Sequence, residues 1–210
     1  RAKNRYACFD TFGQDPQEYG RATYFDVAES CREEVLSQLR ELHLKAAAYL
    51  SRDGFVAQDE FFSVQQIARL VKNAEAYYRT MFLGHVPSWN LRDEHMFETL
   101  ENLARHINSR LAISTQNTKR LHGGGIIVWE HNSHIGDARA TYMVNEGELN
   151  IGQLVREKHG LESFSVGFTT YRGTVTAASS WGGPAERKIV RPALRESYEA
   201  LFHETGMTKF

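Results

Sequence analysis

The sequence predicts an α/β protein, with a parallel or mixed sheet flanked by helices and a long antiparallel helical hairpin in the first half. Apolar residues recur at alternating four- and three-residue steps through that half, which is typical of amphipathic helices. The apolar run GIIVW at 125–129 then begins a series of strand, loop, helix and strand, as in a crossover connection of a parallel sheet. We expect a single domain over 1–210, mainly helical over 26–108 and α/β over 109–210.

Composition and charge exclude several classes of protein. The 210 residues are 41% hydrophobic and 24% charged, with a net charge of -1 and basic residues spread along the chain, so a nucleic-acid partner is not expected. No apolar stretch is long enough to cross a bilayer, and a cytoplasmic protein is expected. Cys8 and Cys31 form no CxxC pair, and we expect both to be buried free thiols in a reducing compartment.

The helical half begins with two long helices of similar length. Ser30 and Glu33 form a capping box for the first, and Gly54 is expected to end it; the second runs from near Asp59 to Gly84. A short turn between two such helices predicts an antiparallel hairpin that packs apolar stripe against apolar stripe. The stripes consist of Val35, Leu39, Leu42, Ala46 and Tyr49, then Ile67, Val71, Ala74, Tyr78 and Met81.

A third helix is expected after PSWN, with Asn90 as its cap and Asp93 and Glu94 in its first turn. Arg92 stands beside Asp93 in this turn. A planar guanidinium can hold a carboxylate or a carbonyl oxygen with two hydrogen bonds. A salt bridge at the helix start is the alternative, and these residues alone favour that second interpretation.

The second half contains the expected strands. IIVWE is an apolar run typical of a strand buried on both faces, and FSVGFTT from Phe164 resembles another. GTVTAAS and ERKIVRP can pair as a two-stranded extension, while helices are expected over 150–159 and from Ser197 to His203. Two or three candidate strands are few for a sheet that must bury IIVW on both faces, so we expect further strands of this sheet upstream of Arg1.

The segment WEHNSHIGDARAT at 129–141 carries the strongest candidate site, because reactive groups gather where the chain leaves the end of a strand. His131, His134 and Asp137 are three residues apart, so one turn would bring their side chains together. Imidazole and carboxylate suit general-base catalysis or the binding of a divalent metal. Alternatively, the histidines bind backbone groups or cap the next helix. The density of polar groups favours a functional site.

Other residues are candidates for contacts with a substrate. Trp129, Asp137 and Arg139 belong to the same segment. Arg172 and Trp181 lie in TTYRGTVTAASSWGGPAE, which suits a pocket wall and a hairpin equally well. The chain contains no G-x-S-x-G elbow, no G-x-G-x-x-G and no Walker A pattern. Hydrolysis through a serine nucleophile of the elbow type is therefore not expected.

Several long motifs resemble the erythromycin esterase family, which includes macrolide-inactivating esterases and many bacterial members. They are VWEHNSHIGDARAT, GELNIGQLVRE, VGFTTYRGTVTAASSWGGPAE and SYEALFH, with YACFD, DEFFSVQQIARLVKNAEAYYRTMF and SWNLRDEHM upstream. The resemblance implies an α/β core with an inserted helical hairpin. It also implies hydrolysis of a carboxylic ester, such as a macrolactone, by direct attack of water without an acyl-enzyme.

The resemblance also implies site residues. Family members place a histidine and an arginine of these motifs in the active-site cleft, and the matching residues are His131, with His134 beside it, and Arg92. The principal general base and a companion glutamate of the family lie in a GE-x-x-HG segment that has no counterpart here, so an N-terminally incomplete domain is expected. Glu130 replaces a small residue, and strand alternation predicts that its side chain points away from the site.

We therefore expect a bacterial, cytoplasmic ester hydrolase that inactivates an antibiotic of the macrolide type, without a membrane or nucleic-acid partner. His131, His134 and Arg92 are its expected catalytic residues. Two alternatives stay open. One is a metal-assisted hydrolase in which His131, His134 and Asp137 hold a divalent metal, the only cofactor that the sequence suggests. The other is a non-catalytic remnant that binds a small ligand in the same cleft.

Overall fold

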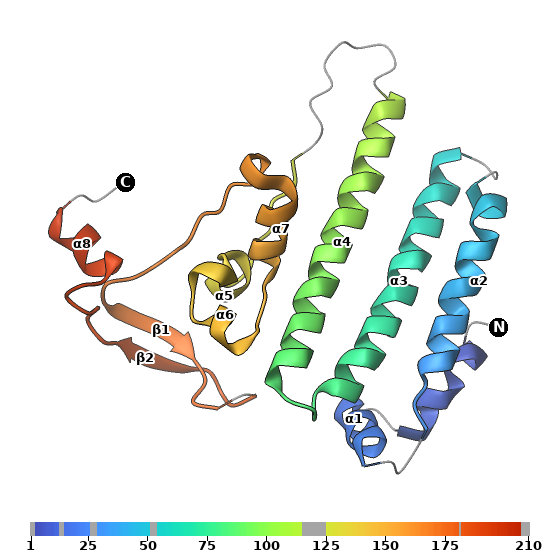
Figure 1. Cartoon of the computed structure of the whole chain (residues 1–210), viewed down its shortest axis with the longest axis horizontal. Helices are drawn as coiled ribbons and strands as arrows, with labels where there is room; N and C mark the ends of the chain where they lie inside the picture. Colours follow the sequence, from blue (N-terminus) through green and yellow to red (C-terminus); the bar gives the residue numbers. More distant parts are fainter. Residues whose placement is uncertain are drawn as a thin grey trace. The chain divides into compact units, whose positions relative to one another are not determined.

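The structure, a computed structural model, describes residues 3–12, 15–25, 29–50, 54–114, 125–180 and 182–206. The chain divides into two compact units, Arg1–Ser165 and Val166–Phe210. The described residues are mostly helical (Figure 1). Among them, no helix is both long enough and apolar enough to cross a membrane.

The first unit contains three long helices that lie side by side, with α3 between α2 and α4 (Figure 1). Shorter helices precede them and follow them in the chain. The α-helices are α1 (Pro16–Tyr24), α2 (Arg32–Leu50), α3 (Gly54–Thr80), α4 (His85–Ser114), α5 (Asn132–Ile135), α6 (Met143–Glu146) and α7 (Ile151–His159). The 3-10 helices are Lys3–Phe12, Ala138–Ala140 and Gly160–Glu162.

The expected antiparallel hairpin is formed by α2 and α3, with different helix ends. Gly54 begins α3 instead of ending α2. The third helix, α4, begins at His85, so Asn90 lies inside it and is not its cap. The Asn90 amide instead donates to Gly147 O at 2.9 Å and accepts the Leu149 N–H at 2.9 Å. A side chain with both a donor and an acceptor thus joins α4 to the segment before α7.

Fewer residues of α3 are buried than predicted, and they lie one position later in the chain than the predicted stripe. Phe61, Ala68 and Glu75, seven residues apart, are buried, whereas Ile67 is 58% exposed. A seven-residue spacing is the seam expected when long helices pack nearly parallel to one another. On α2, Val35 is buried as predicted.

A buried polar contact joins α1 to α3 at the base of the hairpin. The Tyr19 hydroxyl donates to Glu75 Oε1 at 2.6 Å and accepts the Cys31 N–H at 3.0 Å, while Arg79 Nε donates to Glu75 Oε1 at 2.9 Å. Burial, followed by the hydrogen bond to Glu75, raises the pKa of the Tyr19 hydroxyl. The phenol therefore stays neutral and acts as a donor to the carboxylate.

The cysteines do not remain thiols as expected. Cys8 and Cys31 form a disulfide, with their Cα atoms 5.8 Å apart. The prediction failed because it used only the sequence spacing of the two cysteines. The 3-10 helix Lys3–Phe12 packs against α2 and so brings the distant Cys8 beside Cys31.

The expected parallel or mixed sheet is not found in the described part of the chain. Residues 125–131 and 163–170 carry no regular secondary structure, and Ile127 and Phe164 are each 92% exposed. Neither segment has a neighbouring strand within the described ranges to pair its backbone groups, so neither becomes a strand. The helix expected over 150–159 is confirmed as α7.

The second unit contains the expected two-stranded extension. β1 (Gly173–Ala177) pairs antiparallel with β2 (Glu186–Val190). The expected final helix is α8 (Tyr198–Glu204), and the Ser197 hydroxyl caps it by accepting the Ala200 N–H at 3.2 Å. Among the described residues, these two strands form the only sheet.

Replacing Tyr19 by Phe is expected to lower the free energy of unfolding by about 1–3 kcal/mol, because Glu75 and the Cys31 N–H each lose a buried partner. Chemical denaturation followed by circular dichroism measures the change. Tyr24→Phe is the matched control, since Tyr24 lies in the same helix and is 45% exposed. Equal losses in both variants would contradict the role assigned to the Tyr19 hydroxyl.

Candidate active site

A buried carboxylate on α4 is the centre of the candidate site. Asp93 is 0% exposed. Its Oδ1 accepts the Ile151 N–H at 3.0 Å, and both of its oxygens face Nδ1 of His134, at 2.9 and 3.1 Å. A carboxylate can be kept buried only when such donors replace water. Asp93 therefore ties α4 to α5 and to the first turn of α7.

The hydrogen-bond partners of His134 determine which of its ring nitrogens carries the hydrogen. Nη2 of Arg92 lies 3.0 Å from Nε2 of His134. Because a guanidinium only donates hydrogen bonds, Nε2 is the acceptor, and because the Asp93 carboxylate only accepts, Nδ1 carries the hydrogen. This assignment gives a neutral imidazole whose Nε2 lone pair is directed toward Arg92.

Trp89 completes the cluster and was not identified from the sequence. Its ring stacks on that of His134, with the centroids 4.6 Å apart and the planes inclined by 10°. The Arg92 guanidinium carbon lies 4.9 Å from the centre of the indole, and Trp89 Nε1 donates to Leu149 O at 2.7 Å. Residues 89, 92 and 93 share one helix face because side chains three and four positions apart are neighbours on a helix.

The loop that carries the histidines is held by Asn150 and Gly152. Asn150 caps α7 by accepting the Gln153 N–H at 2.9 Å, also accepts the Ala138 N–H at 3.3 Å, and donates to Ser133 O at 2.8 Å. At Gly152 the backbone approaches so closely that a Cβ would lie 2.0 Å from the carbonyl oxygen of Gly136. These contacts fix the loop between α5 and α7.

Glu130 does not point away from the site as expected. Its Oε2 is buried and has no hydrogen-bond partner among the described residues. Burial raises the pKa of the Glu130 carboxyl, Asp93 raises it further, and His134 and Arg92 act in the opposite direction. The prediction from strand alternation was wrong because this segment is not a strand.

His131 and Trp129 lie on the exposed side of the same segment. His131 is the N-cap of α5, where its Nδ1 accepts the Ser133 N–H at 3.2 Å and lies 2.9 Å from Ser133 Oγ. Trp129 is 84% exposed. His131 thus makes the helix-capping contact that was the simpler alternative, and only His134 of the pair contacts Arg92 and Asp93.

The remaining candidates lie apart from this cluster or outside its unit. The Asp137 carboxylate accepts two hydrogen bonds from the Arg139 guanidinium, at 2.9 and 2.7 Å, and this contact is the main reason why the pKa of Asp137 is lowered. Arg172 belongs to the second unit, and Trp181 lies outside the described residues. Within the described ranges, no three His, Cys, Asp or Glu side chains are grouped as ligands of a metal ion.

Arg92 also lines a small hollow of about 150 Å³ between α3 and α4, whose walls are largely apolar. The other lining residues are Leu70, Asn73, Ala74, Tyr77, Tyr78, Leu91 and His95. One guanidinium therefore contacts both the Asp93–His134 pair and a hollow that can receive an apolar group.

Comparison with known proteins gives one clear result. A family model described as erythromycin esterase matches residues 1–210, the whole chain. No solved structure matches the chain.

Gly152→Ala is expected to lower the free energy of unfolding by about 1–3 kcal/mol, because the added Cβ overlaps the carbonyl oxygens of Ile135 and Gly136. Hydrogen exchange of the Ile151 amide, which donates to Asp93, should become faster. Gly167→Ala is the control, since a Cβ there meets nothing within 4 Å. Unchanged Ile151 exchange in Gly152→Ala would contradict the close packing of α5 on α7.

In the wild-type protein, the free energy of unfolding should decrease as pH rises, because the pKa of Glu130 is raised. Glu130→Gln is expected to remove this decrease. A carboxyl with a raised pKa binds its proton more tightly in the folded protein, so the free energy of unfolding falls as pH rises above the ordinary glutamate range. Thermal unfolding from pH 4 to pH 8 tests this, with exposed Glu146→Gln as control. The variant should be the more stable protein at neutral pH. A wild-type melting temperature that rises as much as that of Glu130→Gln over this range would contradict the assignment.

Proposed function

The chain belongs to the erythromycin esterase family, and from this premise we propose that it hydrolyses a carboxylic ester, such as a macrolactone, by adding water to the ester carbonyl. The observation that carries the proposal is the hydrogen-bonded series from buried Asp93 through His134 to Arg92. It combines a possible base with a cation that can stabilise a developing oxyanion. The proposal includes a macrolide substrate, and hence antibiotic inactivation, in the cytoplasm of a bacterium.

In this mechanism, Asp93 keeps the hydrogen of His134 on Nδ1. Binding of the ester draws Arg92 from Nε2 of His134 to the carbonyl oxygen, and water takes its place. Nε2 removes a proton from this water while its oxygen attacks the carbonyl carbon. The imidazolium that results is stabilised by the Asp93 carboxylate, with which it shares two short contacts.

The tetrahedral intermediate carries a negative oxygen, for which the Arg92 guanidinium supplies N–H donors. When the intermediate collapses, the carbon–oxygen bond to the alcohol breaks and His134 returns its proton to the leaving oxygen. Acid and alcohol are the products, and no covalent enzyme intermediate forms. Trp89 acts as a positioning residue, since its ring contacts both His134 and Arg92.

Two neighbouring groups have supporting roles in the proposal. Glu130, whose pKa is raised by burial, can hold a proton close to the reacting groups. His131 has its Nδ1 engaged by Ser133, so Nε2 is the ring nitrogen that it offers to water or substrate. The proposed substrate contacts, Trp129, Asp137, Arg139, Arg172 and Trp181, would bind parts of the ester remote from the carbonyl.

The proposal is tested by incubating the chain with a macrolide and following the gain of one water by mass spectrometry. Asp93→Asn and His134→Ala should each lower kcat/KM by about 10²- to 10⁴-fold, the usual contribution of general acid–base catalysis. Asp10→Asn is the matched control for Asp93→Asn, because Asp10 is exposed, and it should leave kcat/KM unchanged.

Three outcomes would contradict this proposal. Absence of hydrolysis with macrolides and simple esters would favour the ligand-binding alternative, provided that the chain is folded by circular dichroism. Hydrolysis that is lost with a chelator and restored by a divalent metal would favour the metal-assisted alternative. Hydrolysis that survives His134→Ala but not His131→Ala would assign the role of general base to His131 instead.

A further inference from the structure

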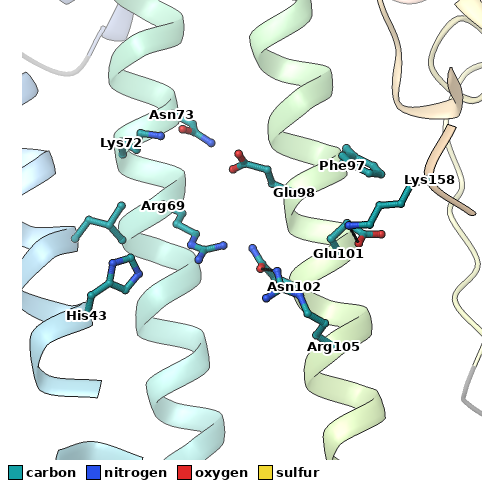
Figure 2. Close-up of a pocket in the computed structure, with 11 residues that line it drawn as sticks. His43, Arg69, Lys72, Asn73, Phe97, Glu98, Glu101, Asn102, Arg105 and Lys158 are labelled. Carbon is teal, nitrogen blue, oxygen red and sulfur yellow. Dashed lines mark hydrogen bonds and ion pairs between the residues drawn. The ribbon is translucent and has the colours of Figure 1, made fainter. Parts of the chain in front are cut away.

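A second cavity, of about 390 Å³, lies among α2, α3, α4 and α7 of the first unit. Figure 2 shows side chains from α3, among them Arg69 and Asn73, extending toward Glu98 and Asn102 of α4. None of Asp93, His134 and Arg92 lines it. The lining residues are Leu39, His43, Arg69, Lys72, Asn73, Phe97, Glu98, Glu101, Asn102, Arg105 and Lys158.

The lining of this cavity has an excess of positive charge. It contains four basic side chains and two carboxylates, so its net charge is +2 with His43 neutral. One carboxylate is already engaged: Glu101 Oε2 accepts from Lys158 at 2.5 Å and Glu101 Oε1 from His159 Nε2 at 2.6 Å. Burial alone would raise the pKa of Glu101, but these two hydrogen bonds lower it, so Glu101 is a carboxylate near neutral pH.

The other basic side chains are not matched in this way. Arg105 donates to the amide oxygen of Asn102 and has no carboxylate partner within the described ranges. Arg69 and Lys72 likewise form no ion pair with a described carboxylate. Three cations thus line a hollow in which Glu98 is the one remaining carboxylate of the described lining, so positive charge is in excess, and like charges at close range repel one another. A bound anion would relieve this repulsion.

We propose that this cavity binds a small molecule through an oxyanion group, a phosphate or a carboxylate, which contacts Arg69, Lys72 and Arg105. Guanidinium and ammonium groups are the usual protein partners of such groups, and charge-assisted hydrogen bonds are the stronger kind. The volume falls in the range of ordinary ligand pockets and exceeds the need of a bare anion. Phe97 and Leu39 supply apolar wall for the rest of the ligand.

The cavity also has a structural connection to the candidate active site. Asn73 lines both this cavity and the small hollow beside Arg92, and its Nδ2 donates to His95 Nδ1 at 2.8 Å. An oxyanion on one side of Asn73 would therefore lie one residue away from the small hollow beside Arg92. The proposal itself does not depend on ester hydrolysis.

Calorimetric titration with inorganic phosphate and, separately, with citrate tests the proposal, at an ionic strength held constant with chloride. Saturable binding of one probe is expected. Arg69→Gln and Lys72→Gln should each weaken it by about tenfold or more, the loss of one charge-assisted hydrogen bond. Glu98→Gln should strengthen it, because a repelling carboxylate is removed from the lining.

Arg40→Gln is the matched control, since it removes the same charge from an exposed position on α2 that does not line the cavity. Binding of phosphate alone assigns a phosphate ligand, and binding of citrate alone assigns a carboxylate ligand. Absence of saturable binding for both probes would overturn the proposal. Equal weakening by Arg40→Gln and Arg69→Gln would also overturn it, because the effect would then come from net charge.

Discussion

The buried Asp93 carboxylate connects α4 of the first unit with α5 and α7. A charge with no exposed surface needs donors from the protein, and Asp93 receives them from the His134 ring and from the Ile151 backbone. These donors come from α5 and α7, whereas Asp93 comes from α4. The hydrogen bonds to this one carboxylate therefore hold three helices together, and the same contacts fix the orientation of the His134 ring.

Other side chains of α4 also hold this region in place through hydrogen bonds. Trp89 and Asn90 bind backbone groups of the segment before α7, while Asn150 caps α7 and also binds the loop of the histidines. A helix cap, a loop anchor and the base of the proposed reaction thus share one hydrogen-bonded network. Arg92 lies at its edge, between this network and an apolar hollow, where a carbonyl oxygen could replace His134 as its partner.

Sequence patterns predicted the local elements and failed at contacts between distant segments. The helical hairpin, α7, α8 and the β1–β2 pair follow from periodicity and turn residues, which act over few residues. The Cys8–Cys31 disulfide and the buried face of α3 depend on packing, which spacing does not reveal. Asp93 was interpreted as a residue of a first helical turn because the start of α4 was misplaced. A helix from His85 would have put Trp89, Arg92 and Asp93 on one face.

The account rests on the state of His134, which nitrogen-15 NMR of the histidine side chains measures directly. Two-bond correlations should show His134 with its proton on Nδ1 and with Nε2 as an unprotonated acceptor at neutral pH. In Asp93→Asn this pattern should change, while the signals of exposed His203 should not. A proton on Nε2, or a His134 spectrum unaffected by Asp93→Asn, would contradict the central claim that Asp93 orients the base.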